Sequence, residues 1–237
     1  MRKALLDGFI QRYNLAGAAE SVLITSEKNA LSTQFITDDK NVLGNVAVRN
    51  VEIEDGEYPV FDTTQLRQLL GVLDDDISVR AAVAGKNIEL SDDSTKVTYV
   101  LADKTNIPAS SGLKKLPPFE IQLVIDQKFV STFVRSSGAL PDVESFTVFA
   151  TNDAVEIVLG HQENINTNKV TMHPTCTRTK VCEPISFSSR YLRAIFMANK
   201  DGSEGVMKIS PDGLIHVNYE SDDFSANYYI AKLDRKD

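Results

Sequence analysis

Apolar residues recur at three- and four-residue spacings in several stretches of the chain, a pattern typical of helices that bury one face. Phe129, Val130, Phe133 and Val134 form the clearest of these stripes. The predicted helices cover residues 2–13, 63–73, 127–136 and 189–199.

Three of these helices share a predicted first turn. A Ser or Asp side chain at the N-cap accepts a hydrogen bond from an otherwise unpaired backbone N–H. An apolar residue just before the cap packs against a second apolar residue four positions after the cap. The predicted caps and the apolar residues before them are Asp62 with Phe61, Asp126 with Ile125, and Ser188 with Phe187.

Elsewhere apolar and polar residues alternate, which predicts strands with one buried face. Phe146, Val148 and Ala150, for example, would point to the same side of a sheet. The predicted strands are 21–26, 31–37, 42–48, 77–83, 87–90, 96–102, 119–125, 146–151, 155–159, 169–173, 185–187, 205–210, 214–219 and 225–231.

Two segments of the first half reappear in the second half in the same order. Residues 20–31 resemble residues 144–155, and residues 61–70 resemble residues 187–196. This self-similarity predicts an α+β fold with two similar domains, each an antiparallel sheet with two helices. The predicted domains are 1–106 and 118–237, joined by a Pro- and Ser-rich connector at 107–117. A single mixed domain with chance similarity is the alternative.

The formal net charge of -8 argues against a protein that coats nucleic acid with its whole surface. Positive charge nevertheless gathers on the outward faces of the predicted helices, while acidic residues gather in loops such as 74–76 and 222–223. This segregation favours one phosphate-facing surface that reads no bases. The candidate phosphate-facing residues are Arg2, Lys3, Arg12, Arg67, Lys128, Arg135, Arg190, Arg193 and Lys200.

The sequence offers little material for an enzyme. It contains no phosphate-cradling glycine-rich loop, no nucleophile-elbow motif and no spacing typical of metal ligands. We therefore predict no catalytic residue, no cofactor and no metal site, and we expect Cys176 and Cys182 to be free or structural thiols. No apolar stretch is long enough for a membrane span or a signal peptide, which predicts a cytoplasmic protein, in the host cytoplasm if it is viral.

Several of these segments resemble one family. The Phe-x4-Leu-Arg helix starts at Phe61 and Phe187, the connector, and the final run 227–233 resemble the polymerase sliding clamps of the proliferating-cell nuclear antigen type. Residues 60–78 look closer to the trimeric clamp of large contractile-tailed bacteriophages.

This resemblance implies a DNA clamp fold and a homotrimeric ring in which the helices line a central hole and the sheets form the outside. It implies a processivity factor that encircles double-stranded DNA without reading its sequence and tethers the polymerase during viral DNA replication. An ATP-driven clamp loader would open the ring, and late-transcription proteins are a further candidate partner.

The resemblance also implies two kinds of protein contact. Partner peptides would enter an apolar pocket lined by Ile107, Leu113, Leu116, Tyr229 and Ile230. Subunits would join through sheet edges near Val97, Tyr99, Leu101, Val170 and Met172.

Two other interpretations remain open from the sequence. The chain could be a monomeric processivity factor that holds DNA by charge alone, although its net charge disfavours this mechanism. It could also be a phage structural or assembly protein with a duplicated β-rich domain.

Overall fold

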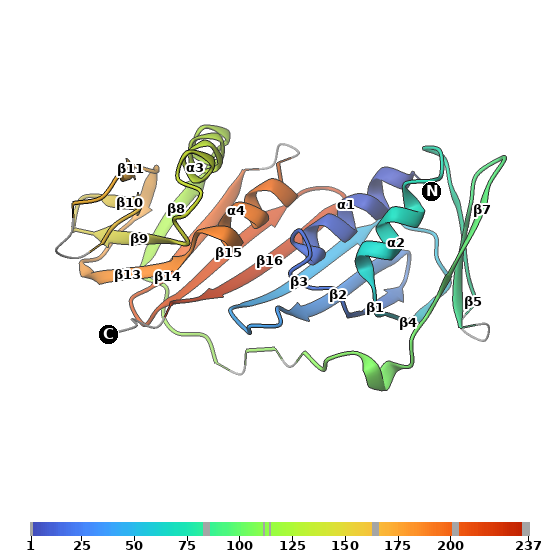
Figure 1. Cartoon of the computed structure of the whole chain (residues 1–237). Helices are drawn as coiled ribbons and strands as arrows, with labels where there is room; N and C mark the ends of the chain where they lie inside the picture. Colours follow the sequence, from blue (N-terminus) through green and yellow to red (C-terminus); the bar gives the residue numbers. More distant parts are fainter. Residues whose placement is uncertain are drawn as a thin grey trace. The chain divides into compact units, whose positions relative to one another are not determined.

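The computed structural model describes residues 2–82, 86–110, 112–113, 115–162, 166–200 and 204–233, with the side chains of 80–82 excepted. The chain divides into two units, drawn with their elements in Figure 1. Unit 1 comprises Met1–Gly112 and Ser221–Ala226, and unit 2 comprises Leu113–Glu220 and Asn227–Asp237. The first division along the chain falls between residues 112 and 113, inside the connector predicted at 107–117.

Unit 1 contains two helices and two runs of antiparallel strands. One run has the order β3-β2-β1-β4, and the other has the order β5-β6-β7. The elements are α1 (Lys3–Asn14), β1 (Val22–Glu27), β2 (Ala30–Ile36), β3 (Val42–Arg49), β4 (Gly56–Val60), α2 (Thr63–Leu70), β5 (Ser78–Ala82), β6 (Asn87–Ser91), β7 (Lys96–Val100) and the short 3-10 turn η2 (Lys104–Asn106).

Unit 2 repeats this plan with one further strand before its first helix and another between its two strand runs. Its strand runs have the orders β11-β10-β9-β13 and β12-β8-β14-β15, the latter continued by the unit 2 part of β16. The elements are β8 (Ile121–Ile125), α3 (Gln127–Ala139), β9 (Ser145–Ala150), β10 (Val155–Leu159), β11 (Val170–Met172), β12 (Cys176–Arg178), β13 (Cys182–Ser188), α4 (Ser189–Ala198), β14 (Gly205–Ser210), β15 (Leu214–Glu220) and β16 (Phe224–Ala231).

The predicted duplication is visible in the topology. The order β3-β2-β1-β4 in unit 1 corresponds to β11-β10-β9-β13 in unit 2, and in both units the second helix follows the last-named strand. Strand β8 pairs with β14 just before α3, and unit 1 retains a single bridge between Arg2 and Asp76 at the equivalent place before α1. Two copies of one domain plan therefore make up the chain.

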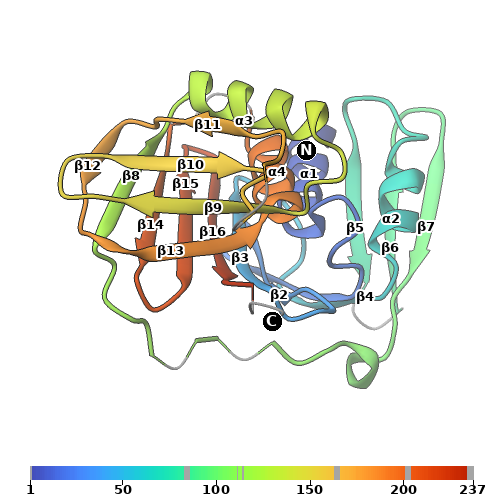
Figure 2. The same cartoon turned by 60° about the vertical axis from the view of Figure 1, so that its left-hand side comes forward.

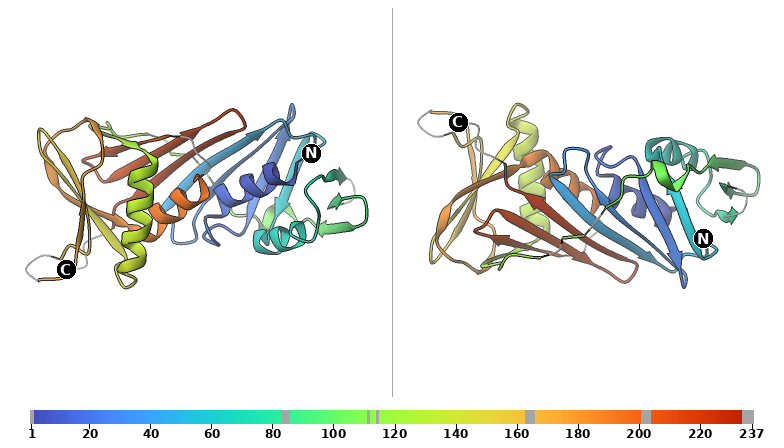
Figure 3. Two further views of the ribbon diagram at one scale, coloured as in Figure 1. Left: turned by 90° about the horizontal axis from the view of Figure 1, so that it is seen from above. Right: turned by 90° about the horizontal axis from the view of Figure 1, so that it is seen from below.

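Within each unit the helices cover one side of the strands (Figure 3). Helix α3 packs against α4 and β11, as Figure 2 shows from another side, and α1 packs against α2 and β3. The centre of unit 2 is an aromatic cluster in which the Phe133 ring lies 5.4 Å from Phe196 and 5.6 Å from Phe146, both edge-on. Such edge-to-face contacts add to the free energy gained by burying the rings.

Two of the three predicted N-caps are confirmed. The Asp62 side chain accepts from the Gln65 N–H at 2.7 Å, and the Asp126 side chain accepts from the Phe129 N–H at 2.7 Å. Ser188 makes no such bond, so this prediction is wrong.

The strand register explains the difference at Ser188. Val22 pairs with Val60 in unit 1, whereas the equivalent Phe146 pairs with Phe187 in unit 2. Phe187 therefore corresponds to buried Val60, not to Phe61, which is 57% exposed. Strand β13 runs directly into α4 and keeps Ser188 extended. The helix starts Thr63 and Ser189 keep the predicted match, and only the predicted match of Phe61 with Phe187 is displaced, by one residue in the strand register.

The predicted helices and most predicted strands are confirmed to within a few residues at their ends, and residue 83 of the predicted strand 77–83 lies outside the described residues. Two strands were not predicted. Pro59 interrupts the pattern of β4, which lies at the end of its strand run, where a missing N–H is tolerated. Strand β12 is only three residues long and has an irregular register with β8.

Candidate nucleic-acid interface

The basic residues of α3 and α4 lie on exposed positions. The apolar stripe of α3 faces inward through Phe129 and Phe133, and that of α4 through Leu192 and Phe196. Neither helix contains an acidic residue. The exposed cations on and directly after these helices are Lys128, Arg135, Arg190, Arg193 and Lys200.

None of these five cations has an acidic partner within the described part of the chain. Arg135 donates through Nε to the neutral Ser131 carbonyl at 3.2 Å. The Arg190 guanidinium lies 5.4 Å from the ring centre of its neighbour Tyr191. Their positive charge therefore remains available to an external anion.

The basic residues on and just before α1 and α2 are arranged differently, because two of them have carboxylate partners within unit 1. Arg67 Nε lies 2.9 Å from Asp7 Oδ1, and the Gln11 amide donates to the other Asp7 oxygen. Arg2 Nη2 lies 3.5 Å from Asp223 Oδ2. The Lys3 ammonium donates to the Leu73 carbonyl just beyond α2.

Arg12 does not lie on an exposed face, so its predicted position is wrong. The residue is only 5% exposed. Its guanidinium donates to the Gly8 carbonyl at 2.9 Å and lies 3.9 Å from the ring centre of Phe224. The arginine is therefore part of the packing of unit 1.

The residues predicted at the subunit interface lie on edge strands or, for Leu101, directly after one. Strand β7 ends the order β5-β6-β7, and β11 ends the order β11-β10-β9-β13. Val97, Tyr99 and Leu101 are nevertheless buried in unit 1, and Tyr99 Oη bonds the Asp62 backbone at 3.1 Å. Met172 is buried in unit 2, while Val170 is partly exposed. Contacts at these edges would use the backbone more than these side chains.

The backbone of β7 offers free hydrogen-bonding groups. Leu101 N–H donates to the Lys86 carbonyl and Asp92 N–H donates to the Thr95 carbonyl, which fixes the bonded pairs of the β6–β7 ladder. Because bonded and non-bonded pairs alternate in an antiparallel ladder, Thr98 and Val100 point their N–H groups away from β6. The Val100 side chain is also 73% exposed. The outward alternation of Lys96, Thr98 and Val100 is the feature of the sequence that indicates this exposed edge.

The predicted partner-peptide residues separate into two groups. Ile230 is fully buried, because alternation along β16 turns it inward with Tyr228, so its prediction is wrong. Tyr229 points the other way and stacks on His216, with ring centres 4.6 Å apart. Leu113 and Leu116 of the connector are 44% and 45% exposed.

Sequence reasoning missed two members of this aromatic surface. The His216 ring lies 5.8 Å from that of Phe119, and its Nε2 lies 3.0 Å from Asn227 Oδ1. Burial lowers the pKa of His216, although the Asn227 contact opposes that shift. The outward alternation of β15 and β16 was the available signal. We name Phe119, His216 and Tyr229 the aromatic face of unit 2.

Ile107 lies at a separate cavity in unit 1. This cavity, of about 490 Å³, lies between strands β1 to β3 and the start of the connector. Gln34 and Asn45, which face each other across β2 and β3, line this cavity. The Ser110 hydroxyl at its wall is buried and has no hydrogen-bond partner among the residues that the structure describes. Ile107 therefore lines a cavity of unit 1, whereas Tyr229 belongs to unit 2.

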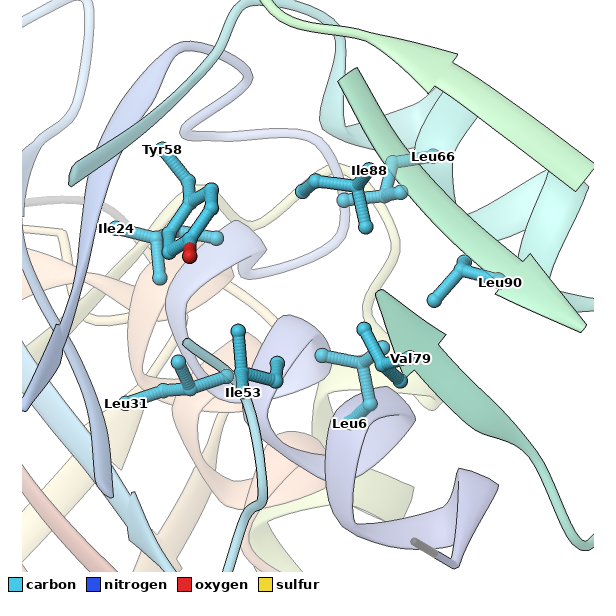
Figure 4. Close-up of a pocket in the computed structure, with 9 residues that line it drawn as sticks. All are labelled: Leu6, Ile24, Leu31, Ile53, Tyr58, Leu66, Val79, Ile88 and Leu90. Carbon is cyan, nitrogen blue, oxygen red and sulfur yellow. The ribbon is translucent and has the colours of Figure 1, made fainter. Parts of the chain in front are cut away.

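A second, small cavity of about 20 Å³ lies inside the apolar core of unit 1 (Figure 4). Leu6, Leu66 and Ile88 are among the side chains around it, and all nine lining residues are apolar or aromatic. A cavity this small and this apolar is a packing defect without binding groups.

Within the described residues, no cluster of His, Cys, Asp and Glu is arranged to hold a metal ion. Cys176 and Cys182, both in that part of the chain, are free thiols. The helices described are too short or too polar to cross a membrane.

Comparison with known proteins gives a clear result at the level of fold. No protein-family model and no curated protein sequence matches the chain. The solved structure of the C-terminal region of FEN-1 bound to A. fulgidus PCNA contains a chain that matches with a TM-score of 0.80, and the match covers 100% of this chain and 98% of that one. The proliferating cellular nuclear antigen of Entamoeba histolytica matches with a TM-score of 0.78, over 99% and 97% of the two chains.

The chain has the fold of these clamp proteins. The predicted α+β clamp fold is thereby confirmed. Sequence identity is 12% in both comparisons, so what they establish is the fold. The resemblance to the clamp of contractile-tailed phages remains a prediction.

Proposed function

We propose that this protein is a sliding clamp, the non-catalytic processivity factor of a replicative DNA polymerase. The observation that carries the proposal is the pair of acid-free helices α3 and α4, with five exposed cations on and beside them, on a clamp fold in a protein of net charge -8. A phosphate-facing surface without base-reading features suits a protein that must move along any sequence.

The proposed assembly is a homotrimeric ring that closes head to tail around duplex DNA. Strand β7 has outward N–H groups and β11 is an edge strand, so one subunit's β7 can extend the β11 sheet of the next. A heterologous contact of this kind must close into a ring, because otherwise it produces filaments.

Function would then follow from topology more than from affinity. A ring that encircles duplex DNA stays linked to it even when each phosphate contact is weak, and weak contacts allow sliding. The chain shows no nucleotide-binding motif, so an ATP-driven loader would open the ring.

Partner proteins, the polymerase first among them, would dock on the aromatic face of unit 2 with Leu113 and Leu116. The binding of the FEN-1 C-terminal region to A. fulgidus PCNA supports peptide docking on this fold. The resemblance of residues 60–78 to phage clamps favours viral DNA replication in a host cytoplasm, with late-transcription proteins as further partners.

Primer extension on a primed circular single-stranded template tests this function. With the cognate polymerase and loader, addition of the protein should lengthen the products of a single binding event. Tyr229→Ala should reduce the gain by weakening polymerase docking, while Tyr229→Phe, which keeps the ring stacked on His216, should retain it. Products of unchanged length with the wild-type protein would refute the proposal.

A further inference from the structure

The two units place their positive charge under different constraints. In unit 1 two of the predicted phosphate-facing cations have carboxylate partners: Arg67 lies against Asp7 and Arg2 against Asp223. Lys3, like Arg135 of unit 2, bonds only a neutral backbone carbonyl. In unit 2 no acidic side chain in the described part of the chain pairs with any of the five candidates. The two units carry similar numbers of cations on their helices, and they differ in which groups those cations contact.

Asp7 has the largest part in this difference. It lies in the middle of α1, and both of its oxygens are used, one by Arg67 of α2 and the other by Gln11 of α1. The carboxylate thus places a negative charge between the two helices and holds the Arg67 guanidinium against them. An approaching phosphate would be repelled by Asp7 and would have to displace it from Arg67.

Arg12 adds nothing to an exposed field in unit 1, because it is buried against Phe224. Lys128 and Arg135, by contrast, are seven residues apart on α3, which places them on the same side of the helix. Arg190 and Arg193 are three residues apart on α4, where neighbouring turns bring them together.

We infer that the proposed clamp contacts duplex DNA through α3 and α4 of each subunit. The Asp7 and Asp223 ion pairs neutralise the positive charge at α1 and α2, so these helices attract DNA only weakly. This inference rests on the proposed function. A trimer would then present three phosphate-binding faces to the duplex, although its six domains share one fold. Between these faces the DNA would meet surface with little net attraction.

The test compares two variants that each remove two cations per subunit. One is Lys128→Gln with Arg193→Gln, and the other is Arg2→Gln with Arg67→Gln. Binding of each full-length protein to a short fluorescent duplex is followed by anisotropy over a range of salt concentrations. Circular dichroism and native mass check that each variant keeps its fold and assembly.

The unit 2 variant should bind more weakly at every salt concentration, and its logarithmic salt slope should become shallower by about 1 for each phosphate that is no longer neutralised. The unit 1 variant should keep the wild-type slope. Equal weakening in the two variants would overturn the inference and leave the clamp function standing. Wild-type protein that binds no duplex even at low salt would count against both.

A third variant tests the role of Asp7 directly. Asp7→Asn removes the counter-charge and leaves Arg67 unpaired, so duplex binding should become tighter. Adding Arg67→Gln to Asp7→Asn should cancel most of this gain. Binding that is unchanged by Asp7→Asn would contradict the neutralisation of the positive charge at α1 and α2.

Discussion

Glu20 joins several parts of unit 1 through its carboxylate. Its oxygens accept from the Thr64 N–H at 2.9 Å, from the Thr64 hydroxyl at 2.6 Å and from the Asn14 amide at 3.2 Å. The Thr63 N–H donates to its backbone carbonyl, as the Ser189 N–H does to Glu144 in unit 2. One residue therefore fixes the start of α2 against the end of α1.

The charge of Glu20 predicts a pH dependence of stability. Burial alone would raise the pKa of Glu20, but the hydrogen bonds from Thr64 and Asn14 outweigh it and lower the pKa below its ordinary 4.5. The unfolded state then binds more protons, so this stabilisation is present above pH 4.5 and disappears as the pH falls through the folded-state pKa.

We predict that Glu20→Gln lowers the free energy of unfolding by about 1 kcal/mol at neutral pH, allowing for the partial exposure of the site. The deficit should shrink as the pH is lowered, because the wild-type carboxyl becomes protonated. Urea unfolding at several pH values measures the difference. A deficit that stays constant as the pH falls to about 3, below the ordinary pKa of a Glu carboxyl, would contradict the assigned role.

The burial of a single charged side chain could not be predicted from the sequence. Helical spacing placed Arg12 beside the apolar stripe of α1, where it looks like a solvated cation. It is buried by Phe224, which lies far away in the sequence. Spacing along one helix gives the direction of a side chain but not the segment that packs over it.

At the scale of elements, periodicity predicted helices α1 to α4 because each carries apolar residues at three- or four-residue spacing along one face. Strands β4 and β12 were not predicted, because β4 contains Pro59 and β12 is only three residues long. The cap at Ser188 failed for a different reason. A strand that continues to the helix start holds its last residue extended by cross-strand pairing, and local sequence does not show that pairing.

The difference between the caps gives an element-scale prediction in unit 2. Asp126→Ala should destabilise the unit by about 1 kcal/mol, because it leaves the Phe129 N–H without its partner. Ser188→Ala should cost clearly less, since its hydroxyl caps nothing. Thermal unfolding of the two variants compares them directly. Equal destabilisation would show that Ser188 contributes in a way the observed bonds do not explain.

At the scale of the whole molecule, the duplication was readable from sequence because helix starts and first strands kept their order at nearly constant offsets. What sequence could not supply was the difference between the copies. The ion pairs of Asp7 and Asp223, the buried Arg12 and the inward turn of Ile230 all depend on tertiary packing. The copies share a fold and differ in the charge each leaves exposed.

Closure of the proposed ring would depend on the backbone of β7, and proline can test this without removing a donor from the β6 ladder. The Thr98 N–H points away from β6, so Thr98→Pro removes an outward donor only, and Thr98→Ala keeps that donor as the matched control.

The native mass of the full chain, measured by light scattering at micromolar concentration, tests the central claim most directly. Wild type and Thr98→Ala should have three times the 26.1 kDa mass of one chain, and Thr98→Pro should shift toward the mass of a single folded chain. A wild-type protein that remains at the mass of one chain, or a Thr98→Pro trimer as stable as wild type, would contradict a ring closed through this edge.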